Sequence, residues 1–262
     1  MSSAGRNHEA VGLLRRMEEV GWHPDVLTYS GVILGLCEDG QVTDALDLLS
    51  KMTSKGISPT LDAYDSLIRG LCIKGEVAEA LDLFSKMTSK GISPDVVTYN
   101  SLIRGLCHSR QWNQACTLLS EMVALNIGPA MITFNILVGA LCKDGLAPEA
   151  HASLEAMAQW GIQPDVRTYR SLIAGYCLRK EMDKAREVFD VMMEKGCGTD
   201  SYSYSMLING FCKIGKVDEA KQLFYEMSDE GLVPDVVTCT TLLNMAYHRQ
   251  GDIVQPRSFS WT

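Results

Sequence analysis

Nine cysteines and five histidines are the side chains of this 262-residue chain that could bind a metal, form disulfides or act as nucleophiles. No cysteine pair has the C-x-x-C spacing of a zinc site, and no histidine pair has the H-x-x-x-H spacing. Six cysteines instead recur every 35 residues on an apolar stripe, and packed helices lie about 8 to 10 Å apart, beyond the roughly 7 Å that a disulfide allows. The pattern predicts core thiols in a reducing compartment, with no metal, no cofactor and no catalytic residue; the six are Cys37, Cys72, Cys107, Cys142, Cys177 and Cys212.

A 35-residue period runs through almost the whole chain. Only Thr199 interrupts a series of prolines at positions 24, 59, 94, 129, 164 and 234. Alanines from Ala45 to Ala220 and methionines from Met52 to Met227 recur with the same step. The period predicts the second half of a preceding repeat, then repeats one to six, then a partial repeat with an irregular tail; the ranges are 1–25, 26–60, 61–95, 96–130, 131–165, 166–200, 201–235 and 236–262.

Each repeat carries two apolar stripes with helical spacing. In repeat three, Tyr99, Leu102 and Leu106 share one face of a first helix, and Ala115 and Met122 share one face of a second. Glycine-containing turns end both helices, and the proline prevents continuation of the second. A hairpin of this size must stack on its neighbours to bury its stripes. The sequence therefore predicts an all-α fold, a right-handed α-solenoid of 35-residue helix-turn-helix repeats.

The first helices distinguish between two families of helical hairpins. Tetratricopeptide repeats have a period of about 34 residues and a W-x-x-L-G-x-x-Y first helix, whereas this chain has VVTYNSLIRGLCHSR and SYSYSMLINGFCKIG. Together with VDEAKQLFYEM in a second helix and G-L-V-P-D at its end, these phrases resemble the pentatricopeptide repeat over residues 8–250. The uniform length resembles the P-type subfamily, and the wording is similar to restorer-of-fertility-like members from plants. A tetratricopeptide-like scaffold that binds a protein partner in its groove is the alternative.

The resemblance implies sequence-selective binding of single-stranded RNA, about one base per repeat, with the N-terminal repeat toward the RNA 5′ end. In the family, the fifth and last residues of a repeat contact the base edge. Asn135 with Asp165 fits the family's uracil pair, and Ser205 with Asp235 resembles its guanine pair, because a carboxylate can accept from the N1 and N2 donors of guanine. The implied base-binding residues are Ser30, Thr60, Asp65, Asp95, Asn100, Ala130, Asn135, Asp165, Arg170, Asp200, Ser205 and Asp235.

Several repeats depart from this reading pattern. Asn100 with Ala130 suggests a pyrimidine but has lost the discriminating acceptor, and Arg170 receives no base. Repeat two has aspartates at both reading positions and Asp62 beside them, which would repel a phosphate backbone, so this repeat is expected to be weak or silent. In the family the second residue packs against the base plane and a lysine late in the first helix can approach phosphate. The matching residues are Leu27, Val97, Ile132, Tyr202 and Val237 for stacking, and Lys143 and Lys213 for phosphate.

Aspartates at the repeat junctions have a second interpretation, because they stand where the next helix begins and could cap its N-terminus. The two roles are compatible. Asn100 and Asn135 lie in a helix interior, where asparagine is unfavourable, which favours a functional role for both. The threonines that recur near the start of the first helices are expected to cap rather than to bind a ligand; they are Thr28, Thr98, Thr133, Thr168 and Thr238.

The net charge of −8, from 24 basic and 32 acidic residues, argues against binding of nucleic acid through bulk charge. Seven 14-residue segments that begin the repeats at 26, 61, 96, 131, 166, 201 and 236 carry nine basic and five acidic residues, a net +4 that leaves −12 for the rest. Affinity for RNA is therefore expected to come mainly from stacking and base-edge hydrogen bonds.

The start and end of the sequence lead to further expectations. No apolar run is long enough to span a membrane, and no transit peptide is visible. The last first helix lacks its partner, which would leave Leu242, Leu243 and Met245 partly exposed and suggests a fragment or a truncated gene product. The resemblance implies a mitochondrial protein, or alternatively a chloroplast one, that acts as a monomer in RNA metabolism with protein partners.

Overall fold

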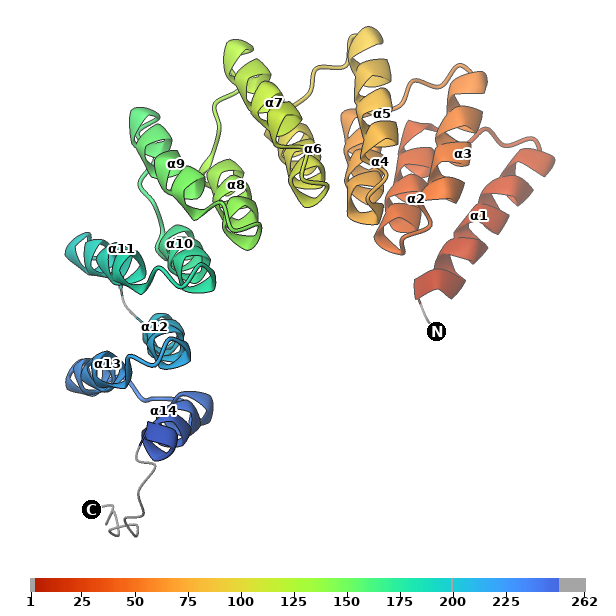
Figure 1. Cartoon of the computed structure of the whole chain (residues 1–262). Coiled ribbons are helices and arrows are strands. Elements are labelled where there is room, and N and C mark those ends of the chain that lie inside the picture. Colours follow the sequence, from red (N-terminus) through yellow and green to blue (C-terminus); the bar gives the residue numbers. More distant parts are fainter. Residues whose placement is uncertain (1–2, 199, 250–262) are drawn as a thin grey trace. The chain divides into compact units, whose positions relative to one another are not determined.

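The computed structural model describes residues 3–198 and 200–249, in which every regular element is an α-helix (Figure 1). Thr199 and the predicted irregular tail at 250–262 lie outside the described residues. The predicted all-α class and the helical hairpins of about 35 residues are confirmed. The helices are α1 (Ser3–Glu19), α2 (Val26–Glu38), α3 (Val42–Ser54), α4 (Leu61–Lys74), α5 (Val77–Ser89), α6 (Val96–His108), α7 (Trp112–Ala124), α8 (Met131–Lys143), α9 (Ala147–Gln159), α10 (Val166–Leu178), α11 (Met182–Glu194), α12 (Ser201–Lys213), α13 (Val217–Asp229) and α14 (Val236–Arg249).

Side-chain caps precede the first helices, and residues in the left-handed conformation follow both first and second helices. Before α6, the Asp95 carboxylate accepts from the Thr98 backbone N–H at 3.0 Å, and the Thr98 hydroxyl accepts from the Asp95 N–H at 3.2 Å. This reciprocal capping box satisfies two donors that the helix itself leaves free. After α4, Gly75 has φ 84°, a left-handed conformation that glycine adopts without strain. Asn126 takes the same conformation, with φ 57°, where the other second helices are followed by glycine.

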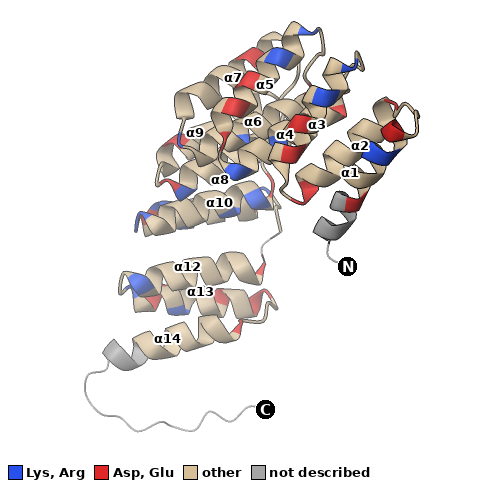
Figure 2. Cartoon of the chain, turned by 90° about the vertical axis from the view of Figure 1, so that its right-hand side faces the viewer, with Lys and Arg blue, Asp and Glu red and all other residues tan. Residues whose placement is uncertain are grey.

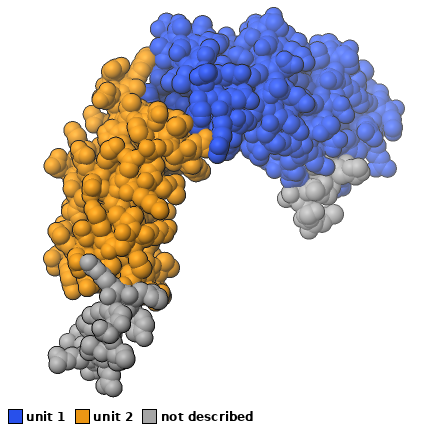
Figure 3. All heavy atoms as spheres, viewed as in Figure 1, with its two compact units in different colours: residues 1–137 blue, residues 138–262 orange. Residues whose placement is uncertain are grey.

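The chain divides into two compact units, residues 1–137 and 138–262 (Figure 3). In unit 1 the first helices α2, α4 and α6 pack in series, while α3 and α5 also contact the first helix that follows them (Figure 1). Within residues 3–137 the second helices α3, α5 and α7 do not come within 8 Å of one another between Cα atoms. The first helices are therefore the more closely packed side of this unit.

Close packing of the first helices depends on glycine and cysteine. A Cβ built on Gly105 of α6 would lie 2.6 Å from the Cys72 sulfur and 2.9 Å from the Cys72 Cβ on α4. In unit 2, Gly175 of α10 meets Cys142 of α8 in the same way. All nine cysteines are free thiols. Four of the six recurring ones are buried, but Cys37 and Cys177 are only partly so, because fewer groups cover them.

Unit 2 repeats this arrangement with α10, α12 and α14 in series. Its core includes Phe189 of α11 and Tyr204 of α12, whose rings meet edge to face with centroids 4.8 Å apart. At the last described helix, Leu243 is 69% exposed, whereas the equivalent Ile208 one repeat earlier is fully buried. The predicted partial exposure of this helix is confirmed, since Leu242 and Met245 are also only half-buried.

Candidate functional site

The second residue of each first helix is exposed although it is usually apolar. Leu27, Val97, Ile132, Tyr202 and Val237 are between 50% and 78% exposed. Large apolar side chains are normally placed inside a fold, and here the same register position stays outside in five repeats. These side chains can therefore offer apolar contact to a ligand. The charged Asp62 and Arg167 occupy the same position in repeats two and five and are exposed as well.

In repeats one and two, the fifth residue lies beside the group that caps the next first helix. The Ser30 hydroxyl is 3.3 Å from the hydroxyl of Thr60, which caps α4. The Thr98 hydroxyl donates to Asp65 Oδ1 at 2.6 Å and lies 3.2 Å from Asp95 Oδ1. The fifth and last residues, 30 positions apart in the sequence, are thus brought together.

Repeats five and six have the same arrangement in unit 2. The Arg170 guanidinium forms an ion pair with Asp200, which caps α12 by accepting from the Ser203 N–H at 3.0 Å. The Thr238 hydroxyl donates to the Ser205 hydroxyl at 2.7 Å, and Asp235 accepts from the Thr238 N–H at 2.7 Å. These hydrogen bonds with Thr238 lower the pKa of Asp235, which keeps its carboxylate charged.

The fifth residue of repeats three and four is an asparagine. Asn100 is 8% exposed, and its Oδ1 is buried without a hydrogen-bond partner among the described residues. The last residue of that repeat, Ala130, cannot cap through its side chain, and its N–H donates to the Thr133 hydroxyl at 3.2 Å. Asn135 is half-buried on α8 in unit 1, and Asp165 caps α10 in unit 2 by accepting from the Thr168 N–H at 2.8 Å. A buried acceptor without a partner, such as that of Asn100, is unusual in a folded protein.

The capping interpretation of the junction residues is confirmed. The threonines at positions 98, 133, 168 and 238 are buried and bonded to the residue before their helix, and Thr28 is bonded to Asp25. Thr98, Thr238 and Ser203 also contact the fifth residue of the preceding repeat, which was not predicted from the sequence. The available signal was the constant separation of 33 residues between these partners.

Electrostatics differ from repeat to repeat. Burial is the main reason that the pKa of Asp65 is raised to about 6. The hydrogen bond from Thr98 and the charge of Arg69 oppose this rise in pKa, whereas the charges of Asp95 and Asp62 add to it. Lys143 and Lys213, the expected phosphate contacts, are exposed at the last residues of α8 and α12. Figure 2 shows basic residues scattered among acidic ones rather than gathered in one stripe. The charge of the described helices in this view is therefore mixed, unlike the concentrated positive charge of a nonspecific nucleic-acid binder.

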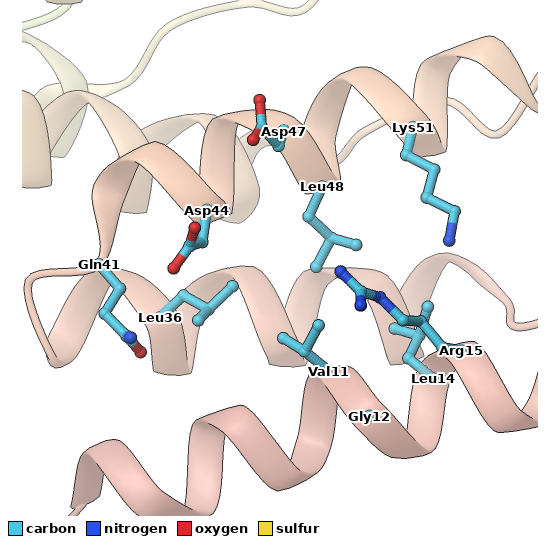
Figure 4. Close-up of a pocket in the computed structure, with 10 residues that line it drawn as sticks. All are labelled: Val11, Gly12, Leu14, Arg15, Leu36, Gln41, Asp44, Asp47, Leu48 and Lys51. Carbon is cyan, nitrogen blue, oxygen red and sulfur yellow. The ribbon is translucent and has the colours of Figure 1, made fainter.

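A separate pocket of about 280 Å³ lies between α1 and α3 in unit 1 (Figure 4). Leu14, Leu36 and Leu48 line it, and the charged Arg15 and Asp44 come from α1 and α3. Most of its lining residues come from α1 and α3, and no fifth residue of a repeat is among them. Among the described residues there is no group of three or more potential metal ligands. Within residues 3–198 and 200–249, no helix has both the length and the apolar character needed to cross a bilayer.

The sequence profile of the PPR repeat family matches six overlapping segments of the chain, at residues 31–73, 62–108, 94–143, 129–178, 171–213 and 206–248. The solved structures that are similar to it include the following three. Maize PPR10 is 22% identical with a TM-score of 0.66, over 94% of this chain and 40% of that one. PPR10 in complex with an 18-nt psaJ RNA element is 25% identical with a TM-score of 0.54, over 91% and 40%. The PPR domain of Arabidopsis thaliana protein-only RNase P 1, in complex with tRNA, is 20% identical with a TM-score of 0.57, over 69% and 95%.

The chain thus spans 40% of the length of the PPR10 chains it matches. No curated protein sequence matches it. The fold is the α-solenoid of these neighbours.

Proposed function

The chain belongs to the PPR repeat family, and from this premise we propose that it binds single-stranded RNA sequence-selectively, about one base per repeat. One observation carries the proposal. In four repeats, the fifth residue lies beside the cap of the next first helix, and the second residues next to these caps are exposed. The RNA complex of PPR10, a neighbour with 25% identity, supports the same class of ligand.

The side chains at this site have the hydrogen-bonding capacity to distinguish bases. The two backbone cap contacts of Asp95 and the one of Asp235 all end on Oδ1, so that Oδ2 of each is available to donors of a ligand. A carboxylate oxygen can accept from the ring N–H and the exocyclic amine of guanine, which supports guanine at repeat six. The unpartnered Oδ1 of Asn100 can accept from a base that enters repeat three, which would relieve the cost of its burial.

Stacking, rather than phosphate contact, supplies most of the proposed affinity. The first-helix segments carry a net charge of only +4, and Lys143 and Lys213 are the two proposed phosphate contacts. Each released counterion contributes a slope of about −0.9 in a plot of log affinity against log salt for duplex DNA, and about −0.7 for single strands. Two contacts therefore give a shallow salt dependence with a slope of roughly −1.4.

Selection from a randomised RNA library tests the proposal. We expect enrichment of U at the position of repeat four and G two positions later, at repeat six. Asn135→Ser should move the preference at repeat four from U toward G. The substitution leaves a serine with Asp165, the combination that resembles the family's guanine pair in repeat six. Asn113→Ser, the same change at an exposed position on second helix α7, is the matched control and should leave the selected sequence unchanged. A folded protein that binds no RNA would remove the proposal.

We also propose a P-type, restorer-of-fertility-like plant protein that stabilises, processes or supports translation of a transcript in mitochondria, or alternatively in chloroplasts. The resemblance of the first-helix phrases supports this finer assignment. Protein partners in RNA processing and a monomeric state belong to the same proposal. Imaging of the tagged protein in plant cells, with organelle markers, tests the compartment, and a purely cytosolic signal would contradict it.

A further inference from the structure

Arg170, the fifth residue of repeat five, is held by three groups at the junction between repeats five and six. Its guanidinium forms an ion pair with Asp200, and its Nε donates to the Ser203 hydroxyl at 3.3 Å. Its Cζ lies 5.0 Å from the centre of the Tyr202 ring, within the range of a cation–π contact. We call the space bordered by Arg170, Asp200 and Tyr202 the base slot of repeat five.

These contacts match those that a guanine would make in the corresponding place in repeat six. The guanidinium is planar and presents adjacent N–H donors, as does the N1–C2–N2 edge of guanine, and both fit a carboxylate. Its flat face can lie against an aromatic ring as a base does. Asp200 is the last residue of its repeat, the position that Asp235 occupies opposite the proposed guanine of repeat six.

We propose that Arg170 is a specificity-determining residue that fills the base slot of repeat five with its own guanidinium, so that RNA passes this repeat unread. This inference rests on the proposed function. A base that entered the slot would have to displace the guanidinium from the carboxylate and the ring together. The positive charge does not make repeat five a phosphate site either, because Asp200 neutralises it.

The consequence is a defined gap in the recognised sequence. Repeats four and six select U and G, and the nucleotide between them is free to vary. Arg170→Ser opens the slot and leaves a serine with Asp200, the combination that repeat six has in Ser205 and Asp235. We expect the selected sequence to change from U-x-G to U-G-G. Binding of the U-G-G RNA should become about tenfold tighter, which is within the range of affinity gained from one additional stacked base.

The experiment compares library selections by the wild type, Arg170→Ser and Arg104→Ser. Arg104 is exposed on the first helix α6, so its replacement removes the same charge without opening a slot, and U-x-G should persist. Selection of a particular base at repeat five by the wild type would overturn the inference while leaving the proposed function intact. Because this outcome is measured on the wild type, it tests the inference even if the Arg170→Ser protein fails to fold. An Arg170→Ser protein that folds but still selects U-x-G would also overturn the inference. If the wild type showed no base selection at any repeat, the proposed function itself would be removed.

Discussion

Replacement of Asp65 by asparagine should stabilise the protein at neutral pH and leave it unchanged at low pH. Burial between α4 and the start of α6 raises the pKa of this carboxyl from 3.8 to about 6. Because the folded-state pKa lies above the unfolded one, the folded state binds a proton more tightly between pH 4 and 6, and stability falls as the pH rises through this window. Above pH 6 the whole penalty is present.

The size of the effect follows from the shift. One pKa unit corresponds to about 1.4 kcal/mol, so the full shift would correspond to about 3 kcal/mol. Asp65 is only half-buried, and solvent screens part of this interaction, so we expect about 1 to 2 kcal/mol. Asparagine keeps an oxygen that can accept from the Thr98 hydroxyl, now at 2.6 Å from Asp65 Oδ1, and carries no charge opposite Asp95.

Urea unfolding followed by circular dichroism at pH 4, 5, 6 and 7.5 measures the difference between Asp65→Asn and the wild type. The stabilisation should grow from near zero at pH 4 to its full value by about pH 7. Asp62→Asn is the matched control, because it removes an exposed carboxylate from the same helix and should change stability by less than about 0.5 kcal/mol. A difference between Asp65→Asn and the wild type that is the same at every pH would refute this account of Asp65.

Two further predictions concern packing and thiol chemistry. Gly105→Ala should destabilise the protein by about 1 to 3 kcal/mol in thermal or urea unfolding, because its Cβ would overlap Cys72. Gly12→Ala on α1 meets no atom within 4 Å and should be neutral or stabilising by up to about 1 kcal/mol, so equal effects of the two changes would contradict the close-packing argument. Cys116 is exposed and should react with a thiol reagent in the native state, whereas Cys142 is buried, with its pKa raised to about 12, and should react only after unfolding. Cys116→Ser should remove one equivalent from the fast phase, and an unchanged fast phase would count against that assignment.

The hairpins could be predicted from the sequence because their signals are local. Apolar spacing, the glycine turns and the capping threonines act within a few residues of each helix end, and the structure has helices where these signals place them. The contact between Asp65 and Thr98 could not be predicted in the same way. It spans 33 residues and depends on how closely α4 and α6 approach, which Gly105 and Cys72 determine in three dimensions.

The site shows the same limit. The 35-residue step identifies Arg170 as the fifth residue of its repeat but does not say where a long flexible side chain will lie. Its position depends on the simultaneous presence of Asp200, Tyr202 and Ser203, none of which is unusual alone. Asn100 is a further case, because its helix position is visible in the sequence but its unpartnered oxygen is not.

The bond that joins the fifth residue of one repeat to the third residue of the next has a consequence for transplanted repeats. A segment cut at the junction aspartates, such as 201–235, would carry Ser205 away from Thr238, its partner across the boundary. Every cut between the fifth residue of one repeat and the third residue of the next divides such a pair. A cut at the turn inside a hairpin, for example after Gly215, also separates Ser205 from Thr238. A segment of two repeats, such as 61–130, keeps Asp65 together with Thr98. Chimeric arrays built on this fold should accordingly be designed with first helices in consecutive pairs.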